Sequence, residues 1–152
     1  MGFLTGKTAI ITGGGRAVLS NGECGSIGYG IATAYAKEGA NLVLTGRNVQ
    51  KLTDAKEELE KKYGIKVLPV QADVSAGSDN EAIVQNVVKQ AIDTFGRIDV
   101  LINNAQASAS GVTIADHTTE QFDLAVYSGL YAAFYYMKAV SYTHLRAHET
   151  SA

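Results

Sequence analysis

The stretch Gly96-Arg97-Ile98-Asp99-Val100-Leu101-Ile102-Asn103-Asn104-Ala105 decides the fold of this chain. Its apolar run at residues 98–102 predicts a buried strand, and a turn of amide and small residues follows it. A second turn, Thr12-Gly13-Gly14-Gly15, follows another short apolar run near the start of the chain. Glycines at a strand end let backbone N–H groups reach a phosphate, so the two turns together indicate a dinucleotide lying across a parallel sheet.

Short apolar runs alternate with longer stretches at helical spacing, which is typical of strand–helix units around a buried parallel sheet. The predicted strands are residues 8–11, 41–45, 66–70 and 98–102. Three helices are predicted between them, ending at Gly39, Gly64 and Gly96, and a long helix is predicted over 119–139. Their predicted buried faces are Ile27, Ile31, Ala34 and Tyr35, then Leu52, Ala55, Leu59 and Tyr63, then Val84, Val88, Ala91 and Phe95.

The sequence therefore predicts an α/β fold with a Rossmann-like, doubly wound parallel sheet, truncated after the fourth strand and its following helix. Right-handed crossovers place the first three strands in one half-sheet. The fourth strand then reverses the winding direction and lies beside the first. This reversal opens a crevice at the carboxyl ends of strands one and four, where both turns lie.

The composition restricts the kind of partner. The chain has 152 residues, 46% of them hydrophobic, and a formal net charge of -2. It lacks the basic patches that nucleic-acid binding requires and an apolar run long enough to span a membrane. The lone Cys24 cannot form an internal disulfide, and no export signal is recognised. We therefore expect a cytoplasmic protein with a small-molecule partner.

The glycine turn continues, after an insertion over residues 16–24, into Gly25-Ser26-Ile27-Gly28. A pyrophosphate needs a helix start with no side chains in the way. The candidates to provide it are Thr12, Gly13, Gly14, Gly15, Ser26, Ile27 and Gly28, with Arg16 as a second phosphate ligand. Turns are glycine-rich in general, so this cluster alone fits an ordinary turn equally well.

The end of the second predicted strand, Thr45-Gly46-Arg47, bears on which dinucleotide binds. NAD-binding sheets commonly place a carboxylate there for the ribose 2'-hydroxyl, whereas a 2'-phosphate recruits a guanidinium. Gly46 offers no carboxylate and Arg47 offers a guanidinium, so NADP(H) is predicted in preference to NAD(H). The alternative is a solvated surface arginine.

Two further strand ends carry polar residues. Asp73 and Val74 can read an adenine edge, with the carboxylate accepting from the N6 amino group and the Val74 N–H donating to N1, although on spacing alone a helix-capping Asp is commoner. Asn103, Asn104 and Ala105 offer side-chain amides that can tie neighbouring strands and a small residue beside which a ribose can pass. A plain turn is the alternative, and the four strand ends together favour the dinucleotide.

These residues together resemble the short-chain dehydrogenase/reductase family from about Lys7 to Ala139. The matching motifs are Thr12-Gly13 with Ser26-Ile27-Gly28 for its TGxxx[AG]xG pattern, Asp73-Val74 for its adenine-reading pair and Asn103-Asn104-Ala105 for its NNAG. The resemblance implies an enzyme that transfers hydride between NADP(H) and a small-molecule carbonyl or alcohol, and a homo-oligomer. It also implies a single domain of roughly 250 residues. Residues 1–139 are then an incomplete NAD(P)-binding Rossmann-fold domain.

No catalytic residue is predicted within this chain. The family's Tyr-x-x-x-Lys pair is absent, and Tyr142 with Arg146 has the spacing but follows the last predicted helix directly. A guanidinium is also a poor substitute for that lysine, which lowers the pKa of the tyrosine. We therefore expect these residues to bind a cofactor without catalysing hydride transfer.

The chain departs from the family pattern in three places. Gln106 replaces the glycine of NNAG, and Gly129, next to Ser128, stands where many members have a helical asparagine that binds a proton-relay water. The insertion followed by Ser-Ile-Gly-Tyr-Gly-Ile-Ala resembles the enoyl-carrier-protein reductases. Carbonyl reduction is predicted first, with enoyl reduction and non-catalytic nucleotide binding as alternatives. A tyrosine stripe predicted to be core or subunit contact is formed by Tyr127, Tyr131, Tyr135 and Tyr136.

Residues 140–152 are predicted to be a non-native tail. The segment from Val140 to Thr150 can be encoded by DNA that resembles a transposase adapter used in sequencing libraries, and apolar helical spacing ends near Ala139. His144 and His148 lie four residues apart, but no third ligand accompanies them, so no metal site is predicted.

Overall fold

The structure, a computed structural model, describes residues 2–149, with side chains described through residue 143. Its sheet has four parallel strands in the order β3-β2-β1-β4. The strands are β1 (Thr8–Thr12), β2 (Asn41–Gly46), β3 (Val67–Gln71) and β4 (Val100–Ile102). Because β4 pairs with β1 on the side opposite β2, the predicted reversal of winding and the doubly wound fold are confirmed.

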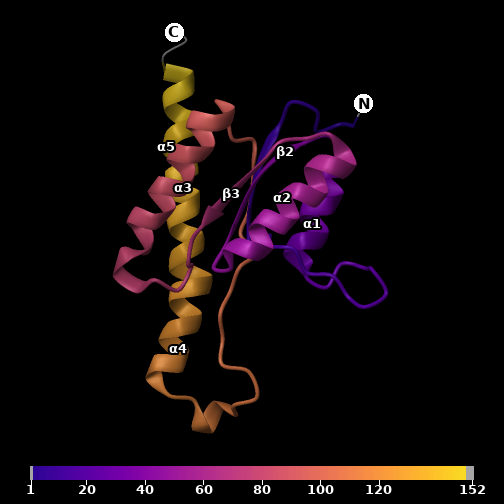
Figure 1. The fold of residues 1–152 in the computed structure, drawn as a ribbon. Coiled ribbons are helices and arrows are strands. Elements are labelled where there is room, and N and C mark those ends of the chain that lie inside the picture. Colours follow the sequence, from indigo (N-terminus) through magenta and orange to yellow (C-terminus); the bar gives the residue numbers. More distant parts are fainter. Residues whose placement is uncertain (1, 150–152) are drawn as a thin grey trace.

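Helices cover both faces of this sheet (Figure 1). On one face lie α1 (Ile27–Lys37) and α2 (Val49–Tyr63), and on the other α3 (Asn80–Phe95) and α5 (Ala132–Glu149). Alternate residues of a strand point to opposite faces, so Ile11 packs with α1 and α2 while Ile10 packs with α3 and α5. Both side chains are fully buried, which explains why the strand sequences are continuously apolar.

The buried faces of two helices agree with the prediction, and that of α1 agrees only in part. In α2 and α3 the predicted residues are buried, except that Tyr63 and Phe95 are partly exposed. In α1, Ile27 is 76% exposed and Ala34 is exposed, whereas Gly28, Tyr29, Ala32 and Ala36 are buried. Ile31 and Tyr35 are partly buried and pack against the core, so the prediction was wrong only for Ile27 and Ala34. Small residues instead let α1 approach the sheet closely.

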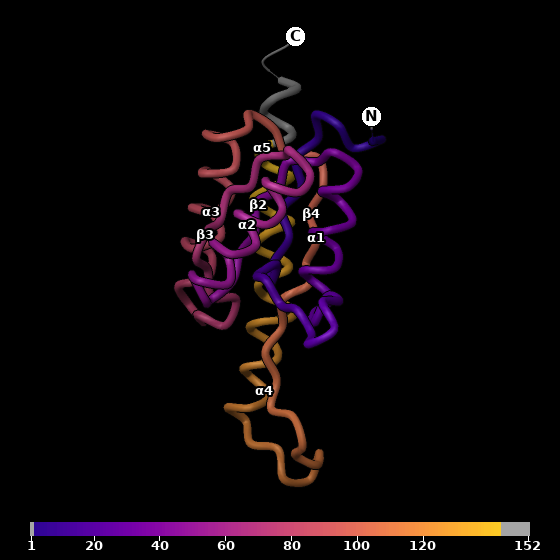
Figure 2. The backbone as a smooth tube through the Cα atoms, turned by 45° about the vertical axis from the view of Figure 1, so that its right-hand side comes forward, coloured from indigo at the N-terminus to yellow at the C-terminus, as the bar shows by residue number. Residues whose placement is uncertain are grey.

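The long helix predicted over 119–139 is interrupted and extends further. It consists of α4 (Thr119–Ala125), a π-helix (Val126–Tyr131) and α5, which continues to Glu149. Two 3-10 turns, Gly77–Asp79 and Ile114–Asp116, complete the regular elements. Figure 2 shows that α4 and the loop leading to it extend away from the layered part of the molecule.

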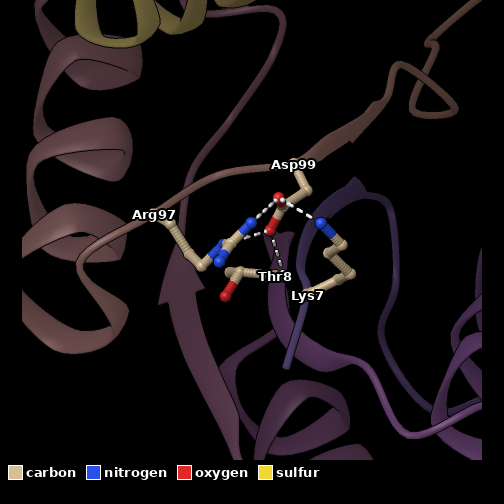
Figure 3. A network of polar contacts seen from close by, with 4 residues as sticks. All are labelled: Lys7, Thr8, Arg97 and Asp99. Atoms are coloured by element: carbon tan, nitrogen blue, oxygen red, sulfur yellow. Dashed lines mark hydrogen bonds and ion pairs between the residues drawn. The ribbon is translucent and has the colours of Figure 1, made fainter. Parts of the chain in front are cut away.

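At the amino ends of β1 and β4, charged side chains tie the two strands together (Figure 3). The carboxylate of Asp99 accepts from the Thr8 N–H at 2.9 Å and from Arg97 Nε at 2.8 Å. Lys7 Nζ lies 3.5 Å from the same carboxylate. This network fixes the register of the strand pair at the amino ends of the strands, opposite the two turns at their carboxyl ends.

Candidate functional site

At their carboxyl ends, β1 and β4 are tied by neutral groups centred on Thr12. Its hydroxyl oxygen accepts from the N–H groups of Asn104 and Ala105, each at 2.9 Å, and donates to the Ile102 carbonyl at 3.3 Å. The Asn104 side-chain amide donates to the Thr12 carbonyl at 2.8 Å. The predicted tie between neighbouring strands is therefore present for Asn104. The Asn103 side chain is exposed and makes no such tie.

The start of α1 packs against this tie without room for a side chain. A Cβ added to Gly28 would lie 2.6 Å from the Asn104 amide nitrogen and still closer to the Gly13 carbonyl oxygen. Gly13 itself has φ +72, a conformation in which glycine costs least. The two glycines therefore bring the first turn of α1 onto the carboxyl end of β1.

The glycine turn uses its backbone groups differently from the expectation. The N–H groups of Gly13 and Gly14 donate to the Thr45 carbonyl at 2.8 and 3.1 Å, so they are not open to a phosphate. The open donors lie in the first turn of α1, where the N–H groups of Ile27 and Gly28 have no carbonyl four residues earlier in the helix. Ser26 caps that turn by accepting from the Tyr29 N–H at 3.4 Å.

Arg16 is directed away from the strand ends. Its Nε donates to Oε2 of Glu58 on α2 at 2.5 Å, and this bond is the main reason that the pKa of Glu58 is lowered. The rest of the insertion forms a small hairpin in which Val18 and Cys24 pair as an antiparallel bridge. The interpretation of Arg16 as a phosphate ligand is therefore not supported by its position, because Glu58 already neutralises its charge.

A crevice of about 270 Å³ lies at the carboxyl ends of β2 and β3, and we call it the Arg47 crevice. Its lining includes Gly13, Gly46, Arg47, Asp73, Val74 and Ala105. The structure thus brings together residues from four predicted strand ends. Arg47 is exposed at the rim of the crevice.

Asp73 does not cap the following helix, which was the commoner alternative. Its Oδ1 accepts from the Ser75 N–H at 2.9 Å and from the Ser75 hydroxyl at 2.6 Å, closing a tight turn. Partial burial alone raises the pKa of Asp73, but these bonds and the charge of Arg47 lower it below its usual value. The carboxylate is therefore ionised at neutral pH and ready to accept further hydrogen bonds.

A smaller crevice of about 140 Å³ adjoins the first, and we call it the Ser128 crevice. Its lining includes Thr12, Asn103, Gln106, Ser128, Gly129 and Tyr136. The Ser128 hydroxyl oxygen accepts from the Ala107 N–H at 2.9 Å, and its single proton faces the carbonyls of Leu124 at 2.7 Å and Ala107 at 2.9 Å. Ser128 thus fastens the loop after β4 to the π-helix.

Ser128 is the residue of the site that sequence reasoning missed. The sequence analysis names Ser128 only as the neighbour of Gly129 and predicts no role for it. The available signal was a small hydroxyl residue within a helix that is otherwise apolar and aromatic, because such a hydroxyl when buried must find a backbone partner. Its exposed fraction is 1%.

A hollow larger than either crevice lies elsewhere. It measures about 490 Å³ and runs between α3 and α5, lined by Glu81, Lys138 and Tyr142 among others. Tyr142 is therefore away from both crevices, in agreement with its rejection as a catalytic residue. We do not assign this hollow to a ligand, because none of the predicted site residues line it.

The residues that the structure describes contain no group of three or more His, Cys, Asp or Glu side chains that could hold a metal ion. The side chains of His144 and His148 lie outside the described part. No helix in that part combines the length and apolar character needed to cross a bilayer.

Comparison with known proteins identifies the class to which this arrangement belongs. The short chain dehydrogenase family matches residues 7–151. The chain belongs to this family of oxidoreductases, and the sequence resemblance is thereby confirmed.

Individual relatives are consistent with this assignment. The chain is 64% identical over 138 residues to a protein of Clostridium sp. named 12alpha-hydroxysteroid dehydrogenase, covering 91% of this chain and 51% of that protein. It is similar to the L-sorbose reductase of Gluconobacter frateurii solved with NADPH and L-sorbose, with 31% identity, a TM-score of 0.77 and coverage of 92% and 48%. It is also similar to an NAD+-bound xylitol dehydrogenase, with 26% identity, a TM-score of 0.80 and coverage of 95% and 50%. The chain spans about half the length of the curated relatives it matches.

Proposed function

We propose that these residues form the cofactor-binding half of a longer NADP(H)-dependent reductase or dehydrogenase that acts on a carbonyl or alcohol. The observation that carries the proposal is the neutral tie of Thr12 and Asn104, which borders two crevices at the carboxyl ends of the strands. Such a reversal point is where open α/β sheets bind nucleotides. Residues that move the substrate proton are expected outside this chain.

Most of the predicted site residues have a role in this proposal, and Arg16, which is paired with Glu58, has none. The open N–H groups of Ile27 and Gly28 would receive the pyrophosphate, aided by the partial positive charge at the start of α1. Asp73 and Val74 would hold the adenine, and Asn103 and Ala105 would border the nicotinamide ribose. When bound, the dinucleotide supplies or accepts the hydride. Gly14 and Gly15 act indirectly, since a Cβ on either would press on Leu44 or Lys51.

The preference for NADP(H) rests on Arg47. Its guanidinium is exposed at the rim of the Arg47 crevice, and Gly46 beside it carries no carboxylate to repel a 2'-phosphate. A charge-assisted hydrogen bond contributes about 1.5 to 3 kcal/mol. We therefore expect Arg47→Ala in the complete protein to weaken NADPH binding about ten- to a hundredfold and to leave NADH binding unchanged. Fluorescence titration of both cofactors measures this.

Arg16→Ala is the matched control for this prediction. Arg16 carries the same charge but is held by Glu58, so its loss should change NADPH affinity by less than about threefold. Equal losses of NADPH and NADH affinity in Arg47→Ala would contradict the assigned role. If Arg16→Ala weakened NADPH binding more than Arg47→Ala does, the 2'-phosphate would be assigned to the insertion instead.

We further propose a hydroxysteroid as substrate. The support is the identity of 64% to a protein named 12alpha-hydroxysteroid dehydrogenase. The family match and the named dehydrogenases and reductases among the relatives favour carbonyl or alcohol chemistry over enoyl reduction.

We also propose that the complete protein is a homo-oligomer. Exposed apolar side chains gather along the π-helix and α5, among them Leu130, Tyr131, Phe134 and Met137, and we propose that they meet a second copy in a homo-oligomer. Tyr136 of the tyrosine stripe is instead buried in the core.

The exposed Cys24, which forms no disulfide, suits a reducing compartment such as the cytoplasm. Residues 140–152 are proposed to lie outside the native domain of residues 1–139.

A further inference from the structure

The two departures from the family pattern beside the crevices are in contact with each other. A Cβ added to Gly129 would lie 3.6 Å from the Gln106 amide nitrogen and 3.8 Å from two carbons of the same side chain. Gln106 comes from the loop after β4, whereas Gly129 lies in the π-helix. These are ordinary contact distances, so the glutamine side chain lies directly beyond the position of a Cβ at residue 129, where a longer side chain would meet it.

The space beside this pair is polar and too small for a substrate. The Ser128 crevice measures about 140 Å³, and a water molecule takes a share of about 30 Å³ in the liquid. Its lining includes Tyr136, which is 1% exposed. The Tyr136 hydroxyl interacts with the Thr45 hydroxyl, but no hydrogen bond of good geometry joins the two groups, so a water in the crevice would complete the hydrogen bonding of Tyr136.

Most other polar groups around the crevice are already in use. The Ser128 hydroxyl is engaged by backbone groups of Ala107 and Leu124. The Thr12 hydroxyl and the Asn104 amide are used in the tie between the strands. Gln106 is exposed and lines both the Ser128 crevice and the Arg47 crevice, so the donor and the acceptor of its carboxamide are open to water.

We propose that Gln106 and Gly129 form a matched pair, in which the Gln106 carboxamide lies over Gly129 and holds ordered water in the Ser128 crevice at the nicotinamide end of the cofactor site. Gln106 is then a positioning residue. A methyl group at position 129 would only touch it, whereas a side chain longer than alanine would displace it. The proposal rests on the proposed reductase function. It adds a residue that acts after the cofactor has bound.

A double-mutant cycle in the complete protein tests the pair. Gln106→Gly removes the carboxamide and Gly129→Asn crowds it, so each change alone should lower kcat about tenfold while the KM for NADPH stays within about twofold. The combined variant puts an amide into the vacated space and should return to within about threefold of the unchanged protein. Losses that multiply in the combined variant would overturn the proposal, as would full activity of Gln106→Gly.

Gln106→Met separates water binding from packing, because it keeps the length of the side chain and loses its polar atoms. Gln106→Met should unfold at the same temperature as the unchanged protein and lose as much kcat as Gln106→Gly.

Thermal unfolding tests the contact between Gln106 and Gly129 independently of enzymatic activity. Gly129→Asn should lower the midpoint by about 2 to 4 °C when Gln106 is present and leave it unchanged with Gln106→Gly. If Gly129→Asn changed the unfolding midpoint equally with Gln106 and with Gln106→Gly, the proposed contact would be contradicted. If the unchanged protein and every variant lacked reductase activity, that result would count against the proposed function and not against the contact.

Discussion

The two ends of the β1–β4 pair are tied by different chemistry. At the amino ends, Asp99 binds the charged side chains of Lys7 and Arg97, which are 45% and 51% exposed (Figure 3). At the carboxyl ends, Thr12 and Asn104 tie the strands through a hydroxyl and an amide. Both ties fix the same register, but only the second borders a crevice.

This difference follows from what each end must leave open. A charged pair at the carboxyl ends would compete with an anionic dinucleotide for the same donors, whereas a neutral tie leaves the helix N-terminus as the attraction for phosphate. The amino ends face no proposed ligand, so charges are tolerated there. We therefore expect changes at the carboxyl ends to be more damaging than changes at the amino ends.

The largest effect is expected for Gly28→Ala. The added methyl group would meet the Gly13 carbonyl and the Asn104 amide. The Asn104 amide is held by the Thr12 carbonyl, and the N–H of Gly13 is bound to the Thr45 carbonyl, so neither group moves aside cheaply. Overpacking of this kind costs about 3 kcal/mol of unfolding free energy. Denaturant unfolding and NADPH titration of the complete protein should both show the loss.

Gly30→Ala in the same helix is the matched control. The nearest atom to its added methyl group would be the Cys24 Cβ at 3.8 Å, which is an ordinary contact. Because alanine favours a helix over glycine by about 1 kcal/mol, this variant should be as stable as the parent or more so. If Gly28→Ala were equally well tolerated, the close approach of α1 to the tie would be disproved.

The next effect is expected for Thr12→Val. This change keeps the shape of the side chain but removes the acceptor for two backbone N–H groups, those of Asn104 and Ala105. An unsatisfied buried donor costs about 1 to 3 kcal/mol, so a loss of about 2 kcal/mol in unfolding free energy is expected. Thr12→Ser keeps the hydroxyl and should recover most of the stability. Equal losses in Val and Ser variants would attribute the effect to packing instead of the hydrogen bonds.

Sequence reasoning succeeded where the residue type alone restricts the local chemistry. The strand order followed from right-handed crossovers and from the reversal at the fourth strand. The side-chain amides of Asn103 and Asn104 were expected to be able to tie neighbouring strands, and Asn104 does so. It failed for Ile27, because the phase of α1 depends on the close contact of Gly28 with Gly13, which is distant in the sequence. The contact between Gln106 and Gly129 could not be predicted from the sequence either, because it depends on how the loop after β4 lies against the π-helix.

The smallest effect is expected at the charged end, for Asp99→Asn. Partial burial alone raises the pKa of Asp99, but hydrogen bonds from Arg97 and the Thr8 N–H, with the charge of Lys7, lower it below its ordinary value. A carboxyl with a lowered pKa stabilises the folded state above its unfolded pKa of about 4, and this contribution is lost as the pH falls through the folded pKa.

At pH 7, Asp99→Asn should therefore reduce the unfolding free energy by about 1 to 2 kcal/mol, a value reduced by the exposure of its partners. The difference between variant and parent should shrink as the pH falls below about 4, because the parent carboxyl is then protonated as well. Asp93→Asn is the matched control, since its i,i+4 pair with Lys89 is 58% to 72% exposed and should contribute less than about 0.5 kcal/mol. Denaturant unfolding at several pH values measures both. NADPH affinity should be unchanged in either variant, and a loss of affinity in Asp99→Asn would show that the two ends of the strand pair are not independent.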